Sequence, residues 1–374
     1  MGRLVFRVGL TLFTSLGFFA CVEPIDFDLP RANDQLVIEG MISDESPPYE
    51  VKLSRGIDLN ADTLIKIPVN DASVTLFDDL GNSESLSAMG NGIYQTTGLI
   101  QGKIGRSYHV VVQTGNQIFR STPDLLSPVG EVDSIKIEYE ARTRMEEFGE
   151  VRADVFNVFV DATAGPDTNP YIRWRLTGTY RAETYPMFHM TWTPPYSPYK
   201  DPFPCSGYIV VEFVPGGKLE KVGPCECCVC WGKEYPDAPT LSDGELVTNG
   251  EFRNVRVGEI PITNYGFYDK YLLAVEQMSM SRAAFDFFKL IRDQKEGSGS
   301  IFQPQSGEIL GNFKSDDSDD RVIGIFWATS IARKHRFIYR EDVPFELTDI
   351  TFITLPCTDI YDNSTYERPS EWVD

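Results

Sequence analysis

The sequence predicts a mainly β protein in which an N-terminal immunoglobulin-like or prealbumin-like β-sandwich is followed by a larger, mostly β domain with one packed helix. Three observations support this prediction. Apolar and polar residues alternate in short runs, which is the period of a half-buried strand. Glycine and asparagine separate these runs at short intervals, as in sandwiches. One strongly helical pattern interrupts the second half of the chain.

The first 20 residues predict a signal peptide, and Cys21 is the predicted lipidation site. Arg3 and Arg7 precede an uncharged apolar run that ends at Ala20. This run is shorter than the roughly 20 residues that a membrane-spanning helix needs. A cysteine directly after the small residue favours a lipoprotein. The alternative is a secreted protein in which Cys21 is the first structural cysteine.

Residues 21–34 are polar and contain proline, which predicts a lipidated tether before the first domain. Cleavage before Cys21 removes two arginines and no acidic residue, so the formal net charge changes from -21 to -23. Phosphate binding needs a basic face, so this charge argues against a nucleic-acid partner. We expect membrane attachment through lipid on Cys21 alone.

Residues 35–126 are predicted to form the first sandwich. Gly115 and Asn116 separate two runs as a hairpin turn, with residues 118–121 as the returning strand. Apolar side chains occupy alternate positions in four runs: Leu36 and Ile38; Tyr49, Val51 and Leu53; Ala72, Val74 and Leu76; and Tyr108, Val110 and Val112. This alternation places one face of each strand in a core.

Residues 127–374 are predicted to form the second domain, because about 350 mature residues exceed what one core usually holds. A Ser-Pro pair near residue 127 marks the boundary. Strand patterns resume at Ile135, Ile137 and Tyr139; at Phe156, Val158 and Val160; and at Ile172, Trp174 and Leu176.

One helix is predicted at about residues 281–295. Ser281 is a suitable N-cap, and Gly297 ends the pattern. Its apolar stripe consists of Ala284, Phe287, Phe288 and Ile291. Such a stripe is typical of a helix that packs on a sheet, so we interpret it as core.

Six cysteines follow Cys21: Cys205, Cys225, Cys227, Cys228, Cys230 and Cys357. An even number in an exported chain predicts disulfides, although the sequence leaves the pairing open. The four clustered cysteines, Cys225 to Cys230, could alternatively form a zinc site. Its Cys-X-Cys-Cys-X-Cys spacing lacks the loop that separates ligand pairs in such sites, so disulfides are preferred.

Residues 187–204 contain five prolines, which exclude a central strand or a helix. The segment is also rich in aromatic side chains: Phe188, Trp192, Tyr196, Tyr199 and Phe203. A long aromatic loop is either a binding surface or a lid over its own domain. Both interpretations stay open.

No catalytic residue is predicted. The three histidines lack the spacing of a zinc hydrolase, and the nucleophile elbow, the phosphate loop and the dinucleotide-binding turn are missing from the sequence. We expect no cofactor. A spatial pair of carboxylates stays possible. Asp316, Asp317, Asp319 and Asp320 are Ca²⁺ candidates, but they lack the ligand order of an EF-hand, so a solvated acidic turn is preferred.

Several segments in this order resemble a known family. They are residues 36–43, 72–79, 92–94, 108–112 and 132–135, the helix from Ser281, and residues 307–313 and 322–326. The chain is similar to a Bacteroidota family of outer-membrane lipoproteins classified as domain of unknown function 4249. The cysteine cluster and Ile325 depart from the family pattern. Members are usually encoded beside TonB-dependent receptors, and the family supplies no catalytic residues to carry over.

The resemblance implies a surface-facing outer-membrane lipoprotein that is a non-enzymatic accessory or substrate-binding partner of a TonB-dependent transporter, with an unknown ligand. Two alternatives come from other classes. One is a carboxylate-dependent hydrolase on the cell surface, which a pocket with two convergent acids would favour. The other is a structural or assembly protein of the envelope, which a broad apolar face without a pocket would favour.

Overall fold

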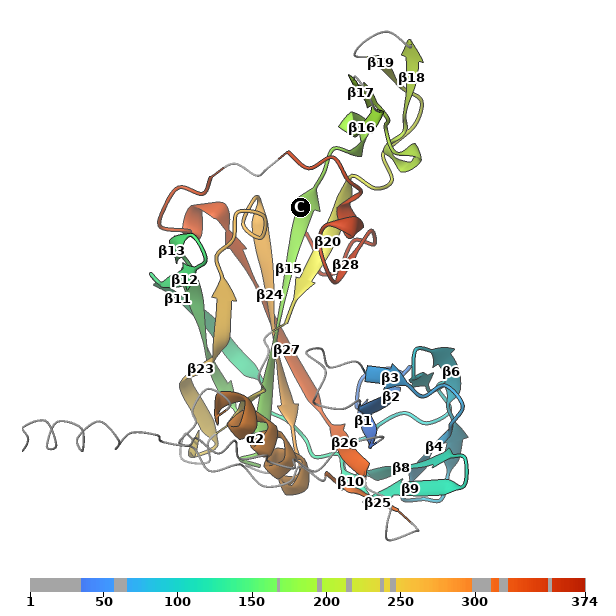
Figure 1. The fold of residues 1–374 in the computed structure, drawn as a ribbon. Helices are drawn as coiled ribbons and strands as arrows, with labels where there is room; N and C mark the ends of the chain where they lie inside the picture. The colour runs from blue at the N-terminus through green and yellow to red at the C-terminus, as the bar shows by residue number, and fades with distance from the viewer. Residues whose placement is uncertain are drawn as a thin grey trace, which may run out of the picture.

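The computed structural model describes residues 35–56, 66–166, 169–193, 197–212, 217–235, 239–242, 247–297, 311–315, 322–348 and 352–373. Two β-sandwiches lie side by side, and a smaller hairpin module projects from the far end of the second (Figure 1). The predicted class, mainly β with one packed α-helix, is confirmed.

The first sandwich consists of two mostly antiparallel sheets. The first sheet has the order β26 (Val322–Thr329), β1 (Leu36–Ser43), β2 (Glu50–Gly56), β7 (Ile93–Gln95) and β6 (Ser87–Gly90), with β3 (Lys66–Pro68) on β2. The second has the order β25 (Phe313–Ser315), β9 (Gln117–Ser121), β8 (Ser107–Thr114), β4 (Ser73–Asp78) and β5 (Ser83–Ser85), with β10 (Asp124–Leu125) on β8.

The predicted alternation sets the core between these sheets. Ile38 and Val51 of one sheet, and Val74 and Val110 of the other, are buried in one cluster. Thr114 pairs with Gln117, so Gly115 and Asn116 form the two-residue turn that the sequence predicts.

Two strands from the far end of the chain complete this sandwich. β26 pairs in parallel with β1, and β25 pairs with β9. The division of the chain predicted at residue 126 therefore does not coincide with the sheets, because residues 313–315 and 322–329 return to the first sandwich. Parallel pairing needs a long crossover, and local sequence patterns give no sign of its destination.

The carboxylate of Glu84 anchors a loop of the first sandwich. It is 1% exposed and accepts hydrogen bonds from the N–H groups of Thr97 at 2.5 Å, Gly98 at 2.9 Å and Ile100 at 2.7 Å. Burial alone would raise the pKa of Glu84, but the hydrogen bonds, with that from Ile100 first, hold the pKa below its usual value.

We expect Glu84→Gln to cost about 1–3 kcal/mol of stability at pH 7, because the amide leaves backbone donors without a charged acceptor. A lowered folded-state pKa contributes stability above the unfolded value, about 4.3, and loses it as the pH falls toward the folded value. Urea unfolding at pH 7 and pH 3 should therefore show a smaller loss on acidification for the variant than for the wild type. An equal loss in both proteins would contradict this role.

The second sandwich also has two sheets. One has the order β11 (Val132–Glu140), β14 (Val155–Thr163), β23 (Glu251–Pro261) and β22 (Val247–Thr248). The other has the order β27 (Ile331–Tyr339), β24 (Lys270–Ser279), β15 (Ile172–Glu183), β20 (Val229–Glu234) and β28 (Ser364–Thr365), with β21 (Thr240–Leu241) on β15. A separate hairpin joins β12 (Thr143–Glu146) and β13 (Gly149–Arg152).

The predicted strand faces form the core of this domain. Val158 and Val160 of β14 and Trp174 of β15 belong to one buried cluster with Phe252 of β23. The rings of Trp174 and Phe252 meet edge to face at 5.1 Å. Short 3-10 helices lie on the C-terminal part of this domain: η4 (Arg340–Asp342) and η5 (Cys357–Asp359).

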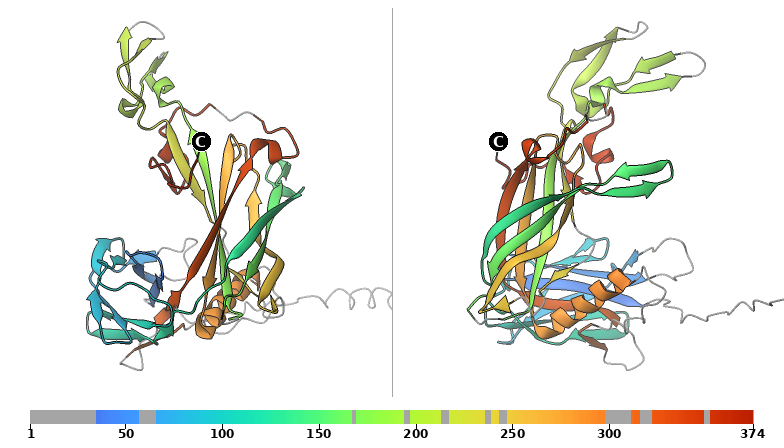
Figure 2. Two further views of the ribbon diagram at one scale, coloured as in Figure 1. Left: turned by 180° about the vertical axis from the view of Figure 1, so that it is seen from behind. Right: turned by 90° about the vertical axis from the view of Figure 1, so that its left-hand side faces the viewer.

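Helix α2 (Arg282–Gly297) packs where the two sandwiches meet (Figures 1 and 2). The N–H of Ala284 donates to the hydroxyl of Ser281 at 3.1 Å, so Ser281 caps the helix as predicted. Phe287 lies in a cluster with Met278 of β24 and Trp327 of β26. The predicted interpretation of the stripe as core is confirmed. No helix within the described ranges has the length and apolarity to span a bilayer.

The projecting module lies between β15 and β20. It contains the hairpins β16 (Met190–Thr193) with β17 (Ser197–Lys200) and β18 (Tyr208–Glu212) with β19 (Lys218–Lys221), together with η1 (Pro186–Phe188) and η2 (Pro204–Ser206). Both views in Figure 2 show it standing away from the sandwiches. The predicted irregular loop at 187–204 is thus partly wrong: its prolines exclude a central strand but allow a two-stranded hairpin.

Candidate ligand-binding site

A pocket of about 1180 Å³ opens at the end of the second sandwich that carries the projecting module. Strands β15, β20, β23 and β24 supply its walls, and the segment from residue 353 to 363 closes one side. Ligand pockets in proteins are typically about 300–1,000 Å³, so this one has room for a molecule larger than a single amino acid.

Two glycines leave room for the tyrosine side chains Tyr271 and Tyr180 at the pocket end of the core. On the inner face of β15, Trp174 and Leu176 are followed by Gly178, and the neighbouring strand carries Gly232. A Cβ atom on Gly178 would lie 1.5 Å from the Tyr271 hydroxyl, and one on Gly232 would lie 2.3 Å from the Tyr180 ring. Only glycine at these two positions allows the tyrosine side chains to approach the strands this closely.

Four tyrosines line the space, and we call it the tyrosine pocket after Tyr180, Tyr265, Tyr271 and Tyr361. Three of their rings cluster, with centroids 5.3 Å apart for Tyr180 and Tyr265, 5.6 Å for Tyr265 and Tyr361, and 6.0 Å for Tyr180 and Tyr361. Burial raises the pKa of each phenol above its usual value. At neutral pH all four hydroxyls therefore keep their protons and can donate hydrogen bonds.

Glu234 is the acid that faces these rings. It pairs with Gly178 across the sheet, and its carboxylate accepts a hydrogen bond from the Tyr271 hydroxyl at 2.8 Å. Burial raises the pKa of Glu234, and the hydrogen bond from Tyr271 opposes that effect. Among the residues that the structure describes, no lysine or arginine forms an ion pair with Glu234.

The charge of a second acid in the pocket is neutralised by neighbouring arginines. Glu259, at the end of β23, forms ion pairs with Arg142 at 2.9 Å and with Arg256 at 2.5 Å. Its charge is therefore held by two guanidinium groups, unlike that of Glu234.

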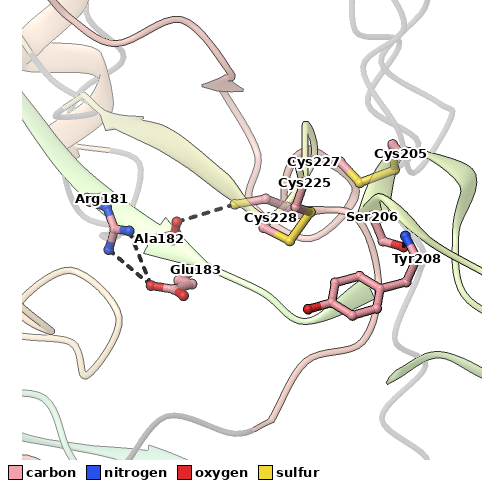
Figure 3. The surroundings of a disulfide bond; sticks show 10 residues. Arg181, Ala182, Glu183, Cys205, Ser206, Tyr208, Cys225, Cys227 and Cys228 are labelled. Atoms are coloured by element: carbon pink, nitrogen blue, oxygen red, sulfur yellow. Dashed lines mark hydrogen bonds and ion pairs between the residues drawn. A yellow bond between two sulfur atoms is a disulfide. The ribbon is translucent and has the colours of Figure 1, made fainter. Parts of the chain in front are cut away.

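The cysteine cluster supports both the pocket and the module. The three disulfides are Cys205–Cys227, Cys225–Cys228 and Cys230–Cys357. The first two lie at the base of the projecting module, beyond the end of β15 (Figure 3), where the N–H of Thr184 donates to the carbonyl of Cys228 at 2.8 Å. The third joins β20 to the segment that closes the pocket, with both cysteines fully buried.

The aromatic residues predicted at 187–204 lie in the module rather than in the pocket. Phe188 and Tyr199 are each 45% exposed. Phe188 contacts Phe352, with ring centroids 5.6 Å apart, and Phe203 contacts His189 at 4.6 Å. The two remaining aromatics of this prediction, Tyr196 and the side chain of Trp192, lie outside the described residues.

Two other predicted sites also lie outside the described residues. They are the lipidation site Cys21 and the acidic run Asp316, Asp317, Asp319 and Asp320. Within the described ranges, no group of three or more His, Cys, Asp or Glu side chains is arranged to hold a metal ion.

Sequence reasoning missed the tyrosine pocket. Its residues are scattered from 176 to 363, and the sequence around each of them is that of an ordinary strand or loop. One usable signal was the interruption of the apolar alternation in β15, where Gly178 follows Trp174 and Leu176. Glycine inside a strand often marks a close approach of another group.

One protein family matches the chain. It is described as Domain of unknown function (DUF4249), and the match covers residues 22–335. No curated protein matches the sequence.

Proposed function

The chain belongs to the DUF4249 family, and on that premise we propose that it is a surface-facing outer-membrane lipoprotein that binds a ligand in the tyrosine pocket and works with a TonB-dependent transporter. In this proposal lipid on Cys21 holds it to the membrane. The transporter and the membrane location are proposed from the family resemblance, and the binding of a ligand is proposed from the pocket.

The pocket is the observation that carries the proposal. It combines a volume of about 1180 Å³ with aromatic walls and a small number of polar groups, which is the usual composition of a ligand site. Its walls are rigid, because they come from adjacent strands and from a segment tied down by the Cys230–Cys357 disulfide. A preformed pocket loses little conformational entropy when a ligand enters.

Binding accounts for the pocket better than hydrolysis does. A carboxylate-dependent hydrolase needs two carboxyl groups with separate roles. Burial raises the pKa of Glu234, but the second carboxylate, Glu259, is held by ion pairs with Arg142 and Arg256 and is not free to take a second role. That arrangement suits a structural ion pair at the mouth of a binding site.

The projecting module supports a protein partner. Its exposed apolar side chains include Phe188, Met190, Tyr199, Ile209 and Val222. Two disulfides at its base restrain it. Exposed aromatic residues on a restrained scaffold are typical of protein interfaces, so we assign the transporter contact to this module.

The proposal predicts that filling the pocket removes the ligand but not the transporter. Asn264 is exposed at the pocket and donates to the Thr348 hydroxyl at 2.6 Å. The tagged lipoprotein should be purified from its own membranes, and the co-purifying small molecules and proteins identified by mass spectrometry. We expect Asn264→Trp to reduce the bound small molecule at least about tenfold while the transporter still co-purifies.

Asn116→Trp is the matched control, because Asn116 lies in an exposed turn of the first sandwich. It should change neither result. Recovery of the wild-type lipoprotein without any transporter, or equal ligand content in Asn264→Trp and wild type, would contradict the proposed function.

A further inference from the structure

Glu234 has no cationic partner among the described residues. Its carboxylate lies between β15 and the tyrosine rings, with the Tyr271 hydroxyl as its hydrogen-bond donor. The nearby arginines are engaged elsewhere: Arg181 pairs with Glu183, and Arg256 with Glu259. Burying a carboxylate without a cation is unfavourable, so such groups are usually paired.

The other charged groups that line the pocket do not supply a cation to Glu234. Lys233 is the one cation among the described lining residues, and strand alternation directs its side chain to the opposite face of β20 from Glu234. Asp362 adds a further acid near Tyr180. Glu234 and Asp362 therefore make the field inside the pocket negative, and an entering cation is attracted by both carboxylates.

The aromatic walls favour the same class of ligand. The faces of tyrosine rings carry a negative potential and attract ammonium and guanidinium groups. Flat stacking of a sugar needs a free ring face, but Tyr271 is stacked on Phe267 at 5.0 Å, and Tyr180 lies against Gly232. Parts of the ring faces and the hydroxyl oxygens remain for a ligand, and both present a negative potential to a compact cationic group.

We infer that the tyrosine pocket binds an organic cation, an ammonium or guanidinium group carried on a molecule of short-peptide size, and that Glu234 is its counter-ion. This inference rests on the proposed function and names its ligand class. The cation would sit beside the Glu234 carboxylate and the tyrosine rings, and the volume of the pocket would hold the remainder of the molecule.

The test uses the complete mature lipoprotein in detergent and two peptides that differ by one charge. The probes are the N-acetylated, C-amidated tripeptides alanyl-lysyl-alanine and alanyl-norleucyl-alanine, and binding is measured by calorimetry. Norleucine keeps the aliphatic part of lysine and lacks its ammonium. We expect the lysyl peptide to bind at least about tenfold more tightly, as a charge-assisted contact does.

Glu234→Gln should remove that preference, since the amide keeps the shape and the bond from Tyr271 but loses the charge. Glu220→Gln is the matched control: it deletes the same charge from an exposed position of β19, and the preference should persist. The melting temperatures of both variants verify that they are folded.

Three outcomes would overturn the inference: no binding of the lysyl peptide at millimolar concentration, equal binding of the two peptides, or an unchanged preference in Glu234→Gln. A neutral natural ligand that Asn264→Trp excludes would leave the proposed function standing and this inference refuted. The two failures are therefore distinguishable.

Discussion

Removal of the Cys230–Cys357 disulfide, by replacing both cysteines with alanine, is expected to lower the free energy of unfolding by about 2–5 kcal/mol. The bond joins residues 127 positions apart, so it restricts the unfolded chain strongly. It also ties the segment with Ile353 and Tyr361 to β20, and both residues line the tyrosine pocket. We therefore expect the variant to lose bound ligand as well. Urea unfolding and ligand recovery measure the two effects.

The Cys225–Cys228 disulfide provides a matched control. Its cysteines are 3 positions apart, so its removal frees a far smaller loop. In the chain-entropy account the two bonds differ by about 3 kcal/mol. The control variant should keep its ligand, because these cysteines lie at the base of the module. Equal destabilisation by the two double variants would contradict the role assigned to Cys230 and Cys357.

Trp174→Ala is expected to cost about 3–5 kcal/mol, because it leaves a cavity in the core of the second sandwich. Trp174 is 1% exposed and meets Phe252 edge to face. Its indole N–H also donates to the Gln277 amide oxygen at 2.9 Å. Gln277 in turn donates to the carbonyl groups of Gly130 at 3.0 Å and Thr163 at 2.7 Å. The substitution thus removes packing and leaves a buried acceptor without its donor.

Two further variants separate the contribution of packing from that of the hydrogen bond and provide an exposed control. Trp174→Phe keeps most of the ring and loses the hydrogen bond, so we expect a smaller loss of about 1–3 kcal/mol. Phe148→Ala truncates an aromatic that is 98% exposed and should leave stability unchanged. Chemical unfolding measures the free energy of unfolding of the three variants. A loss below about 1 kcal/mol for Trp174→Ala would show that this tryptophan does not hold the core.

The strands that depend on local alternation were predictable. The spacing of apolar residues predicts a buried face for Ile38, Val51, Val74 and Val110, and all four belong to one core. The helix was predicted with its Ser281 cap. A period of two or of 3.6 residues records which face of an element is apolar, so the sequence contains that information directly.

The candidate site was only partly predictable. The sequence indicated that Cys230 and Cys357 are half-cystines without naming their partners, because pairing depends on which strands become neighbours. It did not indicate Glu234 as a site residue. That role exists only because Gly178, Tyr271 and Glu234 come from three strands that lie side by side in the sheet.

The sequence alone therefore determined the class of the fold, several of its strands, its helix, the family and the composition that argues against nucleic acid. The tertiary structure decided the return of β25 and β26 to the first sandwich, the disulfide pairing and the tyrosine pocket. The physical reason is the sequence separation over which each interaction acts. Alternation, capping and turns act over a few residues, whereas parallel pairing, disulfides and pockets join residues more than a hundred positions apart, whose encounter is set by the packing of the whole chain.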